Sequence, residues 1–236
     1  MQTQILKLQS AVKHGVGGAG TSAINWIYSA LLQEKGIDFY DYIFINQIGE
    51  DLEEFVMKER KKIHINIRYP ADDDYELKSP AGRDLIRLDI IHTALLRLAE
   101  ADGRVPKDKL AEIRNEILDK NFSFDFAYKQ WRGKKNKDVC ATVVINPMEQ
   151  WFDFYVLVEK NKQAACRVHI YRGRPVLHYL ESFFFYGAWK SENEFVLTGK
   201  IGEVEIHIDV DACLASYTNL TSYEQAPHFE RMKVHQ

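Results

Sequence analysis

Cysteine is scarce in this chain, and the way the cysteines are spaced excludes two common kinds of site. The 236 residues include three cysteines, Cys140, Cys166 and Cys213, and no two of them form a CxxC pair. An odd number of widely spaced cysteines signals neither a zinc site nor a disulfide framework. Each lies in an apolar, strand-like run, where a free cysteine behaves as a small hydrophobe. We therefore predict structural thiols and no metal site.

The chain also has few of the sequence features that direct a protein to a membrane. No run approaches the roughly 18 apolar residues that a membrane span needs. Residues 1–7, Met-Gln-Thr-Gln-Ile-Leu-Lys, lack the basic start and apolar core of a signal peptide. These features predict a soluble, cytoplasmic protein with no membrane partner.

A strong charge of either sign is missing as well. Lysine and arginine number 31 against 34 aspartates and glutamates, which leaves a formal net charge of −3. A general nucleic-acid binder would carry an obvious basic excess, so we expect no nucleic-acid partner. With 46% apolar and 28% charged residues, the composition is that of an ordinary globular protein.

The clearest pattern present is the alternation from Val204 to Asp211. Every second residue is apolar and the others are charged or polar, which is the side-chain period of a β-strand. The pattern predicts four buried side chains, Val204, Ile206, Ile208 and Val210. Similar short segments, separated by turn-forming residues, predict further strands at about 139–145, 151–159, 164–172, 176–186 and 194–198.

Helical periodicity dominates the stretch before these strands. Ser79-Pro80 marks a helix start, because serine caps free amides and proline fits the first turn. This helix is expected at about 80–101, and a second at 106–120. Earlier in the chain, the spacing predicts helices at 22–35 and 50–61, and strands at 37–48 and 62–69.

Together these elements predict an α+β fold. We expect one antiparallel sheet of five to seven strands, with the helix pair packed on one of its faces. The predicted organisation is an N-terminal helical section over 1–61, a main domain over 62–215 and a polar tail over 216–236.

The polar side of the 204–211 strand is the first candidate site. Glu203, Glu205, His207, Asp209 and Asp211 project together, because residues two apart share a face of a strand. Such a row is typical of a solvated surface, and it also suits a basic protein partner or, less simply, a metal ion. We predict a partner-binding face with no catalytic residue and no cofactor.

A glycine-rich loop is the second candidate. Gly15, Gly17, Gly18 and Gly20 precede Thr21, which opens the predicted helix at 22–35. Backbone amides at such a helix start can hold a phosphate. The spacing resembles a Walker A loop with threonine in place of lysine, and also the glycine-rich loop of tubulin-like GTPases. The missing lysine normally reaches the terminal phosphates, so a flexible connection is the simpler interpretation, and a nucleotide-binding enzyme is the alternative.

Two further features have competing interpretations. The aromatic run Phe183 to Trp189 places bulk on both faces of a strand, which indicates either burial or a patch that joins a homodimer. His92, on the inner face of its helix, is expected to be a hydrogen-bonded core residue.

Two stretches carry a resemblance to a known group of proteins. They are Arg87-Leu-Asp-Ile-Ile-His-Thr-Ala-Leu-Leu-Arg-Leu-Ala-Glu100 and Phe184-Phe-Tyr-Gly-Ala-Trp-Lys-Ser-Glu-Asn-Glu-Phe-Val-Leu-Thr-Gly-Lys-Ile-Gly202. From about Ile63 to Val210 the layout resembles the small cytosolic immunity proteins of bacterial polymorphic toxin systems. The resemblance implies a non-enzymatic bacterial protein that binds and blocks a toxin domain, and it carries no functional residue across.

Overall fold

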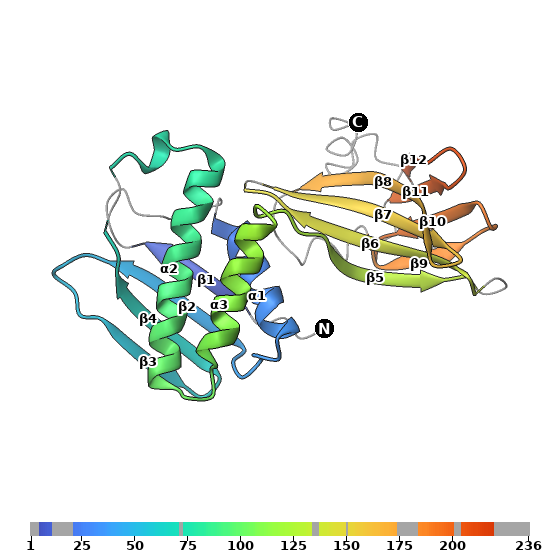
Figure 1. The fold of residues 1–236 in the computed structure, drawn as a ribbon. Helices are drawn as coiled ribbons and strands as arrows, with labels where there is room; N and C mark the ends of the chain where they lie inside the picture. Colours follow the sequence, from blue (N-terminus) through green and yellow to red (C-terminus); the bar gives the residue numbers. More distant parts are fainter. Residues whose placement is uncertain are drawn as a thin grey trace. The chain divides into compact units, whose positions relative to one another are not determined.

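The chain forms two compact units, residues Met1–Phe124 and Asp125–Gln236. The computed structural model describes residues 5–10, 21–70, 73–133, 137–149, 151–173, 184–200 and 204–219. Figure 1 shows the elements of each unit. The predicted boundary near residue 61 falls inside the first unit, because the strand after it pairs with a strand before it.

Unit 1 is built on a four-stranded sheet in the order β1-β2-β4-β3. Its strands are β1 (Ile5–Ser10), β2 (Tyr42–Ile48), β3 (Phe55–Glu59) and β4 (Lys62–Arg68). The first three in this order run parallel, and β3 pairs antiparallel with β4. Ile63, Ile65 and Ile67 of β4 are buried, as their alternation predicts.

The predicted helix at 50–61 is wrong, because this segment contains β3. Leu52, Phe55 and Val56 have spacing that suits a helix, but Phe55–Glu59 forms a ladder with β4 instead. Arg60 turns the chain between the two strands with a φ of 55°. Backbone pairing across this tight turn therefore overrides the local periodicity.

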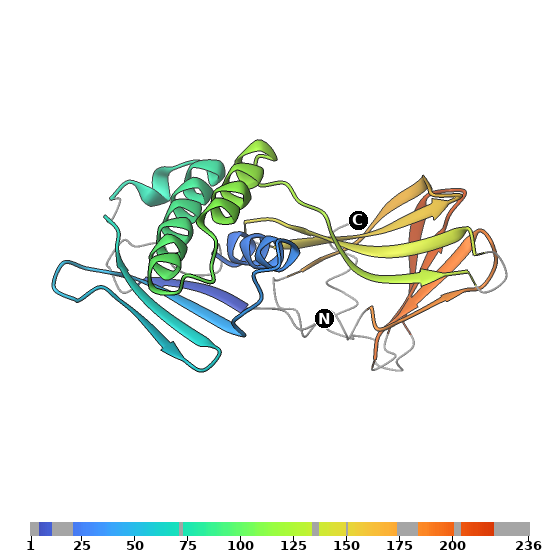
Figure 2. The same ribbon diagram turned by 60° about the horizontal axis from the view of Figure 1, so that its bottom comes forward.

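Three helices cover one face of the unit 1 sheet, as Figure 2 shows. They are α1 (Thr21–Glu34), α2 (Pro80–Ala101) and α3 (Lys107–Asp119), with a short 3₁₀ turn, η1 (Tyr75–Leu77), before α2. The Ser79 hydroxyl accepts a hydrogen bond from the Gly82 amide at 3.2 Å, so the predicted cap is confirmed. The amphipathic helix pair exists as expected, but the sheet that α2 contacts, through β2, β3 and β4, is this largely parallel one.

The described residues of unit 2 form two four-stranded antiparallel sheets. The first contains β5 (Phe126–Arg132), β6 (Val139–Pro147), β7 (Phe152–Lys160) and β8 (Gln163–Gly173). The second contains β9 (Tyr186–Trp189), β10 (Glu194–Thr198), β11 (Val204–Asp209) and β12 (Leu214–Asn219). The α+β class is confirmed, whereas the single sheet of five to seven strands is replaced by sheets of four.

The core of unit 2 lies between its two sheets. Val204, Ile206, Ile208 and Val210 are buried, as the alternation predicts. Along one side, β5 meets β9, where the Trp189 indole donates to the Trp131 carbonyl at 3.1 Å. Along the other side, β8 meets β12, where the Tyr217 hydroxyl donates to the Ile170 carbonyl at 2.8 Å. These contacts hold the two sheets together at both lateral edges.

Two predicted segments fall partly outside the described residues. Most of the strand predicted at 176–186 lies there, since the description resumes at Phe184. The predicted tail over 216–236 begins inside β12, which pairs with β11 through Asn219. Its remainder, 220–236, lies outside the described residues.

Candidate functional site

The outer face of the second sheet of unit 2 carries the polar side chains of three neighbouring strands. On β11 these are Glu205, His207 and Asp209. The strand register places Ser216 opposite His207 and Thr218 opposite Glu205 on β12, and Glu194 opposite Asp209 on β10. The alternation that buries one side of β11 thus aligns its polar side with polar residues on both neighbours.

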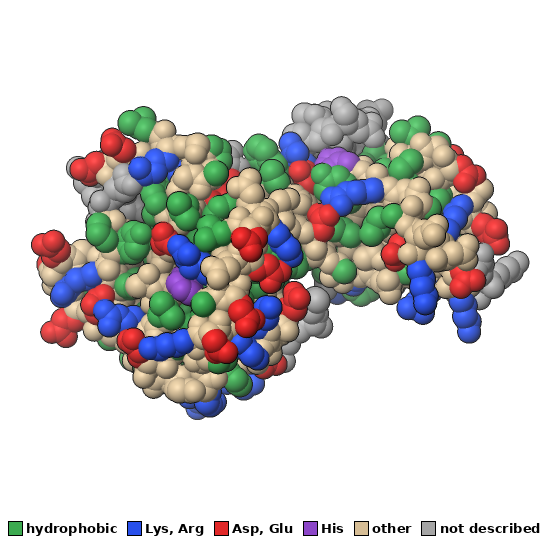
Figure 3. All heavy atoms as spheres, viewed as in Figure 1, with side chains coloured by type: hydrophobic (Ala, Val, Ile, Leu, Met, Phe, Trp, Pro, Cys, Tyr) green, Lys and Arg blue, Asp and Glu red, His purple; other side chains and the backbone are tan. Residues whose placement is uncertain are grey.

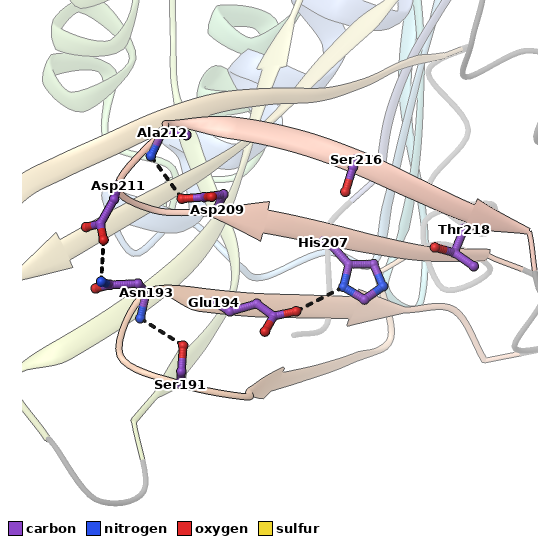
Figure 4. Close-up of a pocket in the computed structure, with 9 residues that line it drawn as sticks. All are labelled: Ser191, Asn193, Glu194, His207, Asp209, Asp211, Ala212, Ser216 and Thr218. Atoms are coloured by element: carbon purple, nitrogen blue, oxygen red, sulfur yellow. Dashed lines mark hydrogen bonds and ion pairs between the residues drawn. The ribbon is translucent and has the colours of Figure 1, made fainter.

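An open depression of about 660 Å³ lies on this face, and Figure 4 shows its lining residues. We call it the acidic depression, because its lining contains three carboxylates and neither lysine nor arginine. It is lined by Ser191, Asn193, Glu194, His207, Asp209, Asp211, Ala212, Ser216 and Thr218.

His207 is held between two carboxylates. Its Nδ1 lies 3.2 Å from Glu194 Oε1, on β10, and its Nε2 lies 3.3 Å from Glu205 Oε2, on the same strand. Both ring nitrogens therefore have an acceptor in place when the imidazole is doubly protonated. His207 therefore bridges β10 and β11 through the two nitrogens of its ring.

The end of the depression near Asp211 is fixed by a set of hydrogen bonds. Asp209 Oδ1 accepts from the Ala212 amide at 2.9 Å, which closes the turn after β11. The Asn193 side-chain amide donates to Asp211 Oδ2, and both contacts are drawn in Figure 4. Lys160 Nζ lies 2.8 Å from Asn193 Oδ1 and 3.6 Å from Asp211 Oδ1. The turn that presents Asp211 is therefore tied to the turn between β9 and β10.

These carboxylates are not arranged as a metal site. No group of three or more histidine, cysteine, aspartate or glutamate side chains in the described parts of the chain is placed to hold a metal ion. The acidic groups are instead spread over strands and turns and bonded to histidine, amide and lysine partners. Such an arrangement offers a negatively charged, hydrogen-bonding surface to another molecule.

The helix face of unit 1 has a different electrostatic character. Figure 3 shows lysine, arginine, aspartate and glutamate side chains interspersed over the region of α2 and α3. Several form ion pairs, including Arg114 with Asp89 at 2.8 Å and Lys107 with Glu100 at 3.2 Å. Mixed signs cancel at a distance, so this face lacks the single-sign field that steers a charged partner.

The structure brings together four residues of the predicted acidic row. Glu205, His207 and Asp209 share the outer face of β11, and Asp211 joins them from the turn. Glu203 lies outside the described residues. Glu194 and Ser216 are not among the residues that the sequence predicts for this site. Glu194 opens a predicted strand, but only the pairing of strands shows that it reaches His207.

The predicted phosphate loop cannot be placed in the same way. Gly15, Gly17, Gly18 and Gly20 lie outside the described residues, and Thr21 is the first residue of α1. Residues of the aromatic run differ in burial. Phe184 is buried, with its ring centroid 5.3 Å from that of Phe154, whereas Tyr186 is 56% exposed.

His92 is hydrogen-bonded as expected, but it is only partly buried. Its Nδ1 lies 3.0 Å from the hydroxyl of Tyr28, which is fully buried. Burial lowers the pKa of His92 below its usual value, and the nearby Arg114 guanidinium lowers it further. The hydrogen bond between His92 and the buried Tyr28 joins α1 to α2.

Comparison with family models, curated proteins and solved structures gives no match for this chain. Among the described residues, no helix is both long enough and apolar enough to cross a membrane.

Proposed function

We propose that this chain is a non-enzymatic protein-binding domain that docks a basic partner on the acidic depression. The observation that carries the proposal is that four carboxylates lie on the same open face as His207, two of them in contact with its ring. Glu194, Glu205, Asp209 and Asp211 come from two strands and a turn and lie on one open face. Complementary charge on such a face accelerates association and disfavours wrong partners.

The resemblance to immunity proteins of bacterial toxin systems supports a specific form of this proposal. In that form the partner is a basic toxin domain, and binding blocks its active surface. An adjacent gene for a large secreted toxin would supply the partner to be tested.

Where a neighbouring gene encodes a toxin domain, the decisive experiment is a binding titration with that domain. Glu194→Lys combined with Glu205→Lys reverses two charges that face His207. Asp209 is left intact, because its carboxylate closes the turn at Ala212. We expect the double variant to bind at least about tenfold more weakly, chiefly through slower association at low salt, with a nearly unchanged melting temperature.

The matched control is Glu53→Lys combined with Glu59→Lys. These two residues are exposed in unit 1, and the change in net charge is the same. The control should bind as the unmodified protein does. Equal affinity of both double variants would refute docking on the acidic depression.

The nucleotide-binding alternative rests on the Gly15–Gly20 loop and stays a sequence prediction. It requires saturable binding of ATP or GTP that is lost in Gly18→Val. A calorimetric titration with ATP or GTP that gives no measurable heat of binding would exclude this alternative.

A further inference from the structure

Two of the three cysteines meet in the structure, although 46 residues of chain separate them in the sequence. Cys166 lies on β8, in the first sheet of unit 2, and Cys213 lies in the turn between β11 and β12, in the second sheet. Their Sγ atoms are 2.8 Å apart, and Cys213 Sγ lies 3.7 Å from the Arg167 carbonyl. The pair therefore sits where the two sheets approach each other.

The surrounding structure holds the two sulfurs close. A disulfide bond is about 2.05 Å long, so closing it requires a movement of less than about 1 Å. Each cysteine is carried by an element fixed in a ladder: β8 pairs with β7, and β11 pairs with β12. The Tyr217–Ile170 hydrogen bond at 2.8 Å joins the same two elements a few residues away.

The backbone of Cys213 adds a second, independent observation. Its φ is 54°, in the left-handed region that non-glycine residues seldom adopt. A non-glycine residue held in this backbone conformation costs free energy, and such residues cluster at functional sites and switch regions. The tight turn closed by Asp209 and Ala212 places Cys213 there, against Cys166.

The two thiols differ in how solvent reaches them. Cys166 is buried, and burial followed by the contact with Cys213 raises the pKa of its thiol to about 12. Cys213 is only partly buried. A reagent in solution therefore reacts with Cys213 first. Cys166 then lies close enough to attack the mixed disulfide that forms on Cys213.

We propose that Cys166 and Cys213 are a reversible disulfide site that is oxidised by exchange with a small-molecule disulfide such as oxidised glutathione. The Cys213 thiolate attacks one sulfur of the reagent, whose S–S bond breaks and releases one glutathione thiolate. Cys166 then loses its proton to that thiolate, and its sulfur attacks Cys213 Sγ and expels the second glutathione thiolate. This second thiolate takes up the proton that Cys213 released to solvent when it ionised. The sum is two protein thiols oxidised to one disulfide and one oxidised glutathione reduced to two glutathione thiols.

The bond would join the two sheets of unit 2 and close a long loop of chain. A crosslink of this kind removes freedom from the unfolded chain, so the oxidised protein should be the more stable form. It would also fix the turn that presents Asp209 and Asp211 in the acidic depression. That last consequence rests on the proposed function, whereas the disulfide itself does not.

The test is to incubate the full chain with oxidised glutathione and count its free thiols by alkylation and intact mass. We expect the loss of two hydrogen atoms in mass, one remaining thiol, and a peptide pair linked through Cys166 and Cys213. The melting temperature should rise by several degrees and return on reduction with dithiothreitol.

Three variants make the outcome specific. Cys140→Ser, which removes the thiol on β6, should form the disulfide as before. Cys213→Ser should form neither the disulfide nor a glutathione adduct. Cys166→Ser should stop at a stable glutathione adduct on Cys213, because the second attack is lost.

Two results would overturn the proposal. One is a full set of free thiols after incubation, and the other is a lasting glutathione adduct on Cys213 in the unmodified chain. Neither result depends on any protein partner, so a failed docking experiment leaves this one intact.

Discussion

At the residue scale, Asp102 holds the end of α2 to the sheet of unit 1. Its carboxylate accepts hydrogen bonds from Arg104 at 2.6 and 2.9 Å, from Lys58 of β3 at 3.3 Å, and from the Tyr40 hydroxyl. The Arg104 hydrogen bonds, followed by that of Tyr40, hold the pKa of Asp102 well below its usual range. Burial, helped by Asp102, raises the pKa of Tyr40 to about 12. One side chain thus connects α2, β3 and the segment before β2.

Replacing Asp102 with asparagine should lower the free energy of unfolding by about 1–2 kcal/mol at pH 7, because charge-assisted hydrogen bonds become neutral ones. The folded pKa is lower than the unfolded value of about 3.9, so this contribution is present above about pH 4 and is lost as the pH falls. Urea unfolding between pH 7 and pH 2 should therefore show the difference from the unmodified protein shrinking with acidity.

Asp73→Asn is the control for this substitution, since Asp73 is exposed in a turn. It should change stability little at any pH. A difference for Asp102→Asn that stayed constant with pH would show that the carboxylate charge does not stabilise the fold.

At the scale of single elements, the turns are set by a few backbone conformations. After α1, the Ile37 amide donates to the Leu32 carbonyl at 2.8 Å and the Gly36 amide to the Gln33 carbonyl at 3.0 Å, which is a Schellman motif. Gly36 has a φ of 75°, as this motif requires. Between β7 and β8, Asn161 and Lys162 both have positive φ, which is the geometry of a type I′ hairpin turn.

Gly36→Ala should destabilise unit 1 by about 1 kcal/mol. An added Cβ would have no heavy atom within 4 Å, so the cost comes from the backbone alone. Thermal unfolding should report it as a lower melting temperature.

Gly103→Ala provides the matched comparison. A Cβ there also meets nothing within 4 Å, and its φ is not in the left-handed region. It should be neutral or slightly stabilising, because alanine restricts the unfolded chain. Equal losses at both positions would contradict the role assigned to the Gly36 conformation.

At the scale of the whole molecule, the two units differ in architecture and each has a core of its own. Unit 1 buries the isoleucines of β2 and β4 beneath its three helices, and unit 2 buries side chains between its two sheets. A fragment over residues 1–124 should therefore fold by itself, as should one over 125–236.

Expression of both fragments, followed by urea unfolding and amide NMR spectra, tests this expectation. Each should show dispersed signals and a cooperative transition. A fragment over 62–124 should not fold, because it removes β1, β2 and β3 from the sheet that β4 completes. Folding of that shorter piece would restore the boundary that the sequence indicates near residue 61.

The sequence alone determined the features that depend on neighbouring residues. Strict alternation identified the buried sides of β4 and β11, and Ser79-Pro80 identified the start of α2. It also placed Glu205, His207 and Asp209 on one face, since side-chain direction in a strand follows from position along the chain. Each of these inferences rests on a period of two or 3.6 residues, which the chain carries locally.

Only the tertiary structure decided which segments meet. Pairing with β4 made a strand of Phe55–Glu59, and the helix pair packed on a sheet formed largely by earlier residues. The same long-range pairing brought Glu194 to His207 and Cys166 to Cys213. Local periodicity gives the direction of a side chain but not the identity of the strand beside it, because that choice depends on loop closure and on burial of the whole core.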